Sequence, residues 1–152
     1  MRGIDVNGNG YGVEVYNSTV YNSGRNWQFD ESAAETQNQH LLYNNISLAG
    51  SQSDNFDTGV TDGFNSWNAG FSASAVDFLS LDDTIARGPR QADGSLPVSN
   101  FLRLAPQSPL VDAGTNVGLP FLGNGPDLGA YEAGPRANAD FDGDGDVDED
   151  DL

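Results

Sequence analysis

The chain has 152 residues, of which 37% are hydrophobic, 19% are charged and 19 residues are glycine, a composition that suits one domain of turns and strands rather than helices. Its formal net charge of −17, with six arginines and no lysine, excludes the basic stripe that nucleic-acid binding requires, and an anionic polymer would also be repelled unless cations bridged it. There is no cysteine, so no disulfide holds the fold, and no apolar run approaches the roughly 20 residues of a membrane span.

Two similar segments, residues 15–21 and 42–48, lie 27 residues apart, and each has the pattern of a short strand, an asparagine turn and a second short strand. A repeat in the twenties without helical periodicity predicts a solenoid, most simply an all-β right-handed parallel β-helix. Turn asparagines tolerate left-handed conformations and bond neighbouring backbone, which is the role predicted for Asn17, Asn22, Asn44 and Asn45. Two of these asparagines also match glycosylation acceptors, the less favoured interpretation.

The remaining elements follow in chain order. Residues 3–12 are expected to form a turn that feeds a strand at 12–16; since no polar cap precedes them, we expect the chain to be the downstream part of a longer protein. Residues 30–39 are expected to protrude as a loop, and residues 56–67 to form the last coil. Short apolar pieces at 76–81, 101–104 and 110–112, separated by prolines, predict an irregular C-terminal cap. The predicted β-helix therefore occupies residues 1–133, followed by a linker at 134–139.

Residues 140–152 have the spacing of a calcium-binding EF-hand loop. Calcium takes about six to eight oxygens, so carboxylates recur at alternate positions, Gly145 permits the sharp turn and Val147 anchors the loop. The predicted Ca²⁺ ligands are Asp140, Asp142, Asp144, Asp146, Asp148 and Asp151. Aspartate at the twelfth position resembles dockerin-type repeats. Only Leu152 follows, so the truncated loop is expected to bind weakly; the alternative is a solvated acidic tail.

Three short motifs stand out in the predicted cap: Gly-Pro-Arg-Gln-Ala-Asp-Gly-Ser-Leu-Pro at 88–97, Ser-Pro-x-x-Asp-Ala-Gly at 108–114 and Asp-Leu-Gly-Ala-Tyr-Glu at 127–132. Together with residues 2–7, 77–82, 101–107 and 117–120, they resemble the C-terminal part of the pectate lyases of polysaccharide lyase family 9. The motif at 88–97 is the narrowest, whereas those at 108–114 and 127–132 recur in many parallel β-helix proteins.

The resemblance implies β-elimination on polygalacturonate. Calcium held by clustered aspartates would bind the uronate carboxylate and acidify the C5 proton, a lysine would remove that proton, and the C4 oxygen would leave. This chain has no lysine and no Asp-Asp-x-x-Asp cluster in its coils, so neither the base nor the catalytic calcium site can be carried over. Arg2 is no substitute, because arginine stays protonated; a structural or substrate-contacting role is expected. No residue is predicted to be catalytic.

Other candidates have two interpretations each. His40, the only histidine, is expected in a turn or loop. Carboxylates in the coils either line a groove or occupy solvated turns, and the solvated turns are favoured. Aromatic residues in the coils either stack on sugars or belong to the core and to ladders of side chains between coils. Cap arginines bind uronate carboxylates or tie down loops. The coil carboxylates are Asp5, Asp57 and Asp62. The coil aromatics are Tyr11, Tyr16, Tyr21, Trp27 and Trp67. The cap arginines are Arg87, Arg90 and Arg103.

The sequence thus predicts the C-terminal coils and cap of a secreted or cell-surface, calcium-dependent pectate lyase-like protein of bacterial type, inactive alone. The full-length protein would act on pectate, and its calcium module would bind a cohesin-like or cell-surface partner. The alternatives are a non-catalytic β-helix that binds polysaccharide or serves as a surface structural element, and an acidic repeat protein whose tail recruits calcium for stability. An upstream lysine with an aspartate cluster would separate the first alternative from the enzyme.

Overall fold

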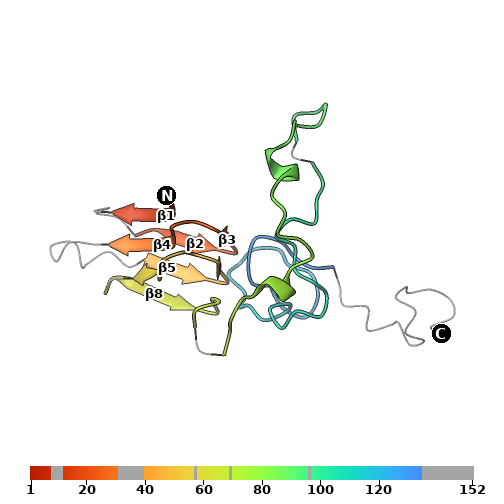
Figure 1. The fold of residues 1–152 in the computed structure, drawn as a ribbon. Helices are drawn as coiled ribbons and strands as arrows, with labels where there is room; N and C mark the ends of the chain where they lie inside the picture. Colours follow the sequence, from red (N-terminus) through yellow and green to blue (C-terminus); the bar gives the residue numbers. More distant parts are fainter. Residues whose placement is uncertain (8–11, 31–39, 57, 69, 96, 135–152) are drawn as a thin grey trace.

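The computed structural model describes residues 1–7, 12–30, 40–56, 58–68, 70–95 and 97–134. Among them, eight strands form three parallel sheets, ordered β1-β4-β7, β2-β5-β8 and β3-β6 (Figure 1). The strands are β1 (Arg2–Asn7), β2 (Glu14–Tyr16), β3 (Thr19–Tyr21), β4 (Arg25–Asp30), β5 (His40–Tyr43), β6 (Ile46–Leu48), β7 (Asn55–Phe56) and β8 (Val60–Gly63). Two single 3₁₀ turns, η1 (Ala75–Asp77) and η2 (Ile85–Arg87), lie beyond them.

The strand registers confirm the predicted parallel β-helix. Tyr16 pairs with Tyr43 and Thr19 with Ile46, so equivalent residues of the first two coils are 27 positions apart, as the sequence repeat requires. Tyr43 then pairs with Gly63, which places β8 in the next coil and confirms a coil at 56–67. Parallel strands stacked this way place like residues about 4.8 Å apart along the solenoid.

The asparagine turns are left-handed where the sequence predicts them. Asn17, Asn22 and Asn44 have φ of 46°, 54° and 59°, values that asparagine adopts more readily than other side chains because its amide bonds locally. Asn45 has a different role: it is fully buried, its Nδ2 donates to the Val15 carbonyl at 2.9 Å, and its Oδ1 accepts from an amide of the preceding coil. This burial confirms the ladder interpretation of Asn45 over glycosylation.

The interior of the solenoid is closed by aromatic packing. Trp27, Phe29 and Leu42 are completely buried, and smaller side chains from β1, β2 and β8 pack around them. Trp27 stacks on Phe29 at 6.4 Å between ring centroids and lies 5.2 Å from Trp67. The alternation of side chains along each strand sends these residues inward, so the same strands present their other side chains outward.

The C-terminal region packs against the side of the coils, beside β3 and β6 (Figure 1). Ile46 and Leu48 of β6 point outward and form a second core with Phe78, Leu104, Leu110, Val111 and Leu128. Gly129 approaches so closely, with φ of +94°, that a Cβ there would lie 2.5 Å from the Thr19 hydroxyl. The irregular cap predicted from the prolines is therefore a lateral cover joined to the coils by backbone contact.

Buried carboxylates explain two of the recurrent motifs. Asp127 is fully buried and accepts from the backbone N–H groups of Asp112 at 2.8 Å and Ala133 at 2.5 Å. Asp77 accepts from the Ser74 N–H at 2.8 Å and from the Ser108 hydroxyl at 3.0 Å. A carboxylate that receives several such donors fixes irregular backbone without regular sheet, so these motifs serve the fold.

Candidate functional site

Strands β1 and β4 carry two arginines in register. Arg2 pairs with Arg25 in the ladder, and each reaches forward three residues along its own strand, Arg2 to Asp5 at 2.8 Å and Arg25 to Gln28. The buried Nε of Arg25 has no hydrogen-bond partner among the residues that the structure describes. The Arg2 contact fits the expected structural role, since the guanidinium is held by a neighbour on the same strand.

His40 does not lie in a turn or loop, and that expectation was wrong. It is the first residue of β5 and is completely buried. Its Nδ1 accepts the Val13 N–H at 3.0 Å, and its ring meets Phe29 edge to face at 5.2 Å. Histidine suits this position because its ring fills space beside Phe29 while its Nδ1 accepts a partly buried backbone N–H.

Most of the aromatic candidates are packing residues. Trp27 is in the solenoid core, Trp67 stacks on Phe56 at 4.9 Å, and Tyr21 contacts Phe101 edge to face at 6.0 Å. Tyr11 lies outside the described residues. The core and ladder interpretation is confirmed for these three rings, and Tyr16 lies on the outward face of β2 beside a recess.

Tyr16 belongs to a recess that the sequence alone did not reveal. It stacks beside Tyr43 at 6.3 Å between centroids, tilted by 42°, and the two rings face the cap segment 115–117 across a cavity of about 320 Å³. Its hydroxyl donates to Glu14 Oε2 at 2.9 Å. Burial, followed by this bond to Glu14, raises the pKa of Tyr16 above its ordinary value. The recurrence of tyrosine at the same repeat position was the available signal, whereas nothing in sequence spacing pointed to the cap segment.

The three cap arginines bind their own loops. Arg87 pairs with Asp83, Arg90 donates to the Gly94 carbonyl at 3.4 Å, and Arg103 Nε donates to the Ser99 carbonyl at 3.1 Å. Arg103 also lies over the Tyr131 ring, 4.7 Å from its centroid. These contacts support the second of the two interpretations of the cap arginines, in which they tie down loops and do not bind uronate carboxylates.

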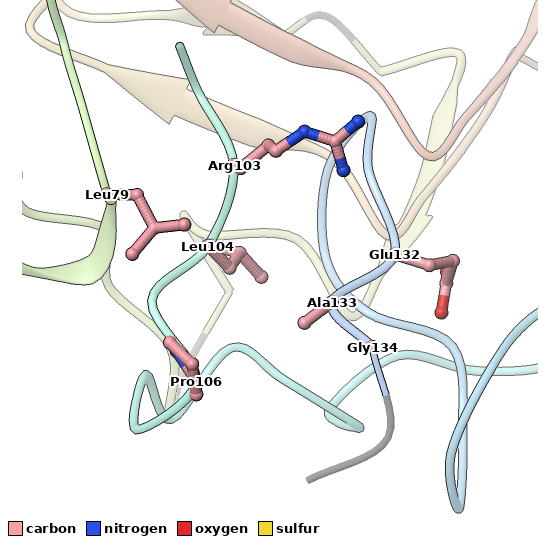
Figure 2. A pocket seen from close by; sticks show the side chains of 7 residues that line it. All are labelled: Leu79, Arg103, Leu104, Pro106, Glu132, Ala133 and Gly134. Atoms are coloured by element: carbon pink, nitrogen blue, oxygen red, sulfur yellow. The ribbon is translucent and has the colours of Figure 1, made fainter. Parts of the chain in front are cut away.

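A second recess of about 260 Å³ lies beside Arg103 and is lined mainly by apolar side chains, Leu79, Leu104, Pro106 and Ala133 (Figure 2). The Arg103 and Glu132 side chains point in different directions there, so the two charges do not converge on a ligand (Figure 2). Glu132 instead accepts the N–H groups of Leu122 and Asp127, each at 3.2 Å. Burial raises the pKa of Glu132 against the opposing effect of these two bonds.

Carboxylates in the described part of the chain do not gather into a metal site. No group of three or more His, Asp or Glu residues that could hold a metal is found there. Asp62 accepts from Trp67 Nε1 at 2.7 Å and Asn68 Nδ2 at 2.8 Å, and Asp5 holds Arg2. Asp57 and the six predicted calcium ligands from Asp140 to Asp151 lie outside the described residues.

No family model matches the chain, but individual proteins do. It is 41% identical over 132 residues to pectate lyase L of Dickeya chrysanthemi, covering 86% of this chain and 30% of that protein. Over that length the chain is homologous to pectate lyase L. Pectate lyase L of Paenibacillus polymyxa (strain SC2) is 36% identical over 126 residues, covering 77% of the chain and 26% of that protein.

The crystal structure of pectate lyase Pel9A superposes with a TM-score of 0.74 at 36% identity, covering 86% of this chain and 32% of that one. The parallel β-helix is therefore supported by the strand registers and by a solved relative. The chain spans about a third of the length of the proteins it matches. No helix in the described ranges has the length and hydrophobicity needed to cross a bilayer.

Proposed function

We propose that this chain forms C-terminal coils and the lateral cap of a secreted, calcium-dependent pectate lyase-like β-helix, and that it does not carry out β-elimination alone. The observation that supports this most is the match of 86% of the chain to about a third of pectate lyase L. Strands β1, β2 and β3 each have one edge without a partner in the described part of the chain, and an open edge accepts another strand.

The chemistry itself explains why the activity belongs to a longer protein. Abstraction of a proton beside a carboxylate needs an unprotonated base, which the resemblance implies is a lysine, and a cation that offsets the developing charge. The sequence offers no lysine, and arginine remains protonated at ordinary pH. The described residues hold no carboxylate cluster for the cation, so no catalytic step is assigned to them.

Two samples test this proposal. The first is the chain alone with polygalacturonate and calcium, for which we expect no ultraviolet absorbance from unsaturated uronate. The second is a chimera in which residues 1–134 replace the matching segment of pectate lyase L from Dickeya dadantii, which is also 41% identical. We expect the chimera to be folded and active, with activity lost in EDTA. Lyase activity of the chain alone would contradict the assignment.

A non-catalytic β-helix that binds polysaccharide is the second candidate, favoured by the absence of lysine from the whole sequence. The same chimera separates the two functions. A chimera that melts cooperatively but cleaves nothing, while the chain alone is retained on an insoluble pectate column, would support the binding module.

We further infer that Asp140, Asp142, Asp144, Asp146, Asp148 and Asp151 hold Ca²⁺, as the loop spacing supports. The test is calorimetric titration of the full chain with calcium. We expect Asp140→Ala with Asp144→Ala to abolish binding, whereas Glu149→Ala with Asp150→Ala, at positions ten and eleven of the loop, removes the same charge from the tail and leaves it. Equal loss in both pairs would indicate a diffuse acidic tail.

A further inference from the structure

We propose that the recess between the Tyr16 and Tyr43 rings and the cap segment 115–117 binds a neutral pyranose unit of a glycan. Its lining is Tyr16, Tyr43, Thr115, Asn116 and Val117. Apolar ring faces combined with a few hydrogen-bonding groups are typical of small-ligand sites, and a sugar presents both kinds of surface, C–H groups on its faces and hydroxyls at its edge.

The strand register places the aromatic face and leaves space beside it. Tyr16 and Tyr43 occupy equivalent positions of β2 and β5, and both are half-buried. The equivalent position in the next coil, on β8, is Gly63, where a Cβ would lie only 3.0 Å from Tyr43 Cε1. The glycine therefore permits the Tyr43 ring to lie over the β8 backbone, which sets the tilt of the platform.

The opposite wall is held rigidly to the same coil corner. Asn44, the residue after Tyr43, is completely buried, and its Oδ1 accepts the Thr115 N–H at 2.8 Å while its Nδ2 donates to the Thr115 carbonyl at 2.8 Å. Gly114 makes this approach possible, since a Cβ there would lie 2.9 Å from the Asn44 amide. The distance between ring and wall is thus fixed by a buried amide.

Three polar groups of the lining have no hydrogen-bond partner in the described part of the chain: the Tyr43 hydroxyl, the Thr115 hydroxyl and the Asn116 amide nitrogen. Asn116 Oδ1 accepts the Gly118 N–H at 2.8 Å, which leaves its Nδ2 as a donor. Hydroxyl groups that both donate and accept, together with one amide donor, suit the vicinal hydroxyls of a sugar.

The charge around the recess selects a neutral ligand. Glu14 lies at its edge, bonded to the Tyr16 hydroxyl, and no arginine lines it. A uronate carboxylate would be repelled by Glu14 and by a chain of net charge −17. This site therefore differs in substrate class from the pectate assigned above and does not depend on that assignment.

The test is an NMR titration of the full chain, by ¹H–¹⁵N spectra, with β-1,4-galactotetraose, cellotetraose and tetragalacturonate. We expect at least one neutral tetraose to shift the amides of Tyr43 and 115–117. Asn116→Asp keeps the bond to Gly118 but replaces the free donor by a carboxylate, and it should weaken binding by roughly fivefold or more. Gly63→Ala should also weaken binding, because it displaces the ring while both tyrosines remain.

Asn100→Asp is the matched control, an exposed asparagine of the cap outside the recess, and it should bind as the unaltered chain does. Unchanged spectra elsewhere show that the Asn116 variant is folded. The proposal is overturned by unaltered affinity in Asn116→Asp, by shifts that map away from the recess, by tetragalacturonate binding there as tightly as the neutral sugars, or by binding of neither neutral tetraose.

Discussion

Replacing Asn44 by glycine tests whether one side chain joins the cap to the coils. Glycine keeps the left-handed backbone, since φ there is 59°, so the substitution removes the amide without straining the turn. The lost bonds run from Asn44 Nδ2 to Asn17 Oδ1 at 2.9 Å and to the Thr115 carbonyl at 2.8 Å, and from the Thr115 N–H to Asn44 Oδ1 at 2.8 Å.

Three bonds, each contributing about 0.5–1.5 kcal/mol, give an expected loss of about 3 kcal/mol in the free energy of unfolding. Asn17→Gly is the matched variant. It also keeps a left-handed turn, with φ of 46°, but among the described residues its side chain accepts a single hydrogen bond, from Asn44 Nδ2. We expect that substitution to cost about 1 kcal/mol.

Urea unfolding followed by tryptophan fluorescence and by amide hydrogen exchange gives the assay. Both tryptophans, Trp27 and Trp67, are in the coils, so fluorescence reports the solenoid. The Gly129 N–H, bonded to the Asn44 carbonyl at 2.7 Å, reports the cap. In Asn44→Gly we expect cap amides to exchange faster at urea concentrations where fluorescence is unchanged. Equal stability of the two glycine variants, or no change in cap exchange, would refute the reasoning.

Three other predictions follow from single contacts. Gly129→Ala places a Cβ 2.5 Å from Thr19 Oγ1 at a φ of +94°, and should cost about 3 kcal/mol by urea unfolding, against about 1 kcal/mol for Gly118→Ala, which has φ of +83° and open space. His40→Ala leaves the Val13 N–H unpaired beside a cavity and should cost about 3 kcal/mol by the same assay; a cost near zero would show that the ring is dispensable. Burial raises the folded-state pKa of Glu132, so its contribution to stability is complete below the unfolded-state pKa and is lost as pH rises through the folded-state pKa. A carboxyl NMR titration should place that midpoint above the ordinary value for glutamate, and a midpoint at or below it contradicts the burial argument.

The coils were predictable because their repeat is local. Tyrosine, asparagine and aliphatic residues recur 27 positions apart, and parallel stacking converts that spacing directly into the Tyr16–Tyr43 and Thr19–Ile46 registers. Left-handed asparagine turns followed from side-chain chemistry alone. The motif at 127–132, which the sequence linked to the fold, contains the buried Asp127 that fixes the cap backbone.

The errors arose where a side chain acts on another coil. His40 was expected in a turn or loop because the sequence shows no cysteine or serine constellation near it, yet its ring accepts a backbone N–H 27 residues earlier. The recess was missed because Thr115 is 71 residues from Asn44, a separation at which no periodicity operates. Sequence pattern identifies what stacks on what within the solenoid, but a lateral cap has no register to reveal its contacts.

The coil corner at Tyr43 and Asn44 connects the repeat of the solenoid to the lateral cap. One strand residue turns its ring outward, and the next residue, in a left-handed conformation, turns its amide toward the cap. The Asn44 amide bonds to the backbone carbonyl and N–H of Thr115, so it constrains the position of the segment 115–117 without constraining its side chains. Changes at Asn116 or Val117 can therefore alter what the recess accepts while the register of the coils stays the same. Ligand choice at this face is expected to vary with the cap loop, and the pair of tilted tyrosine rings to remain with the repeat.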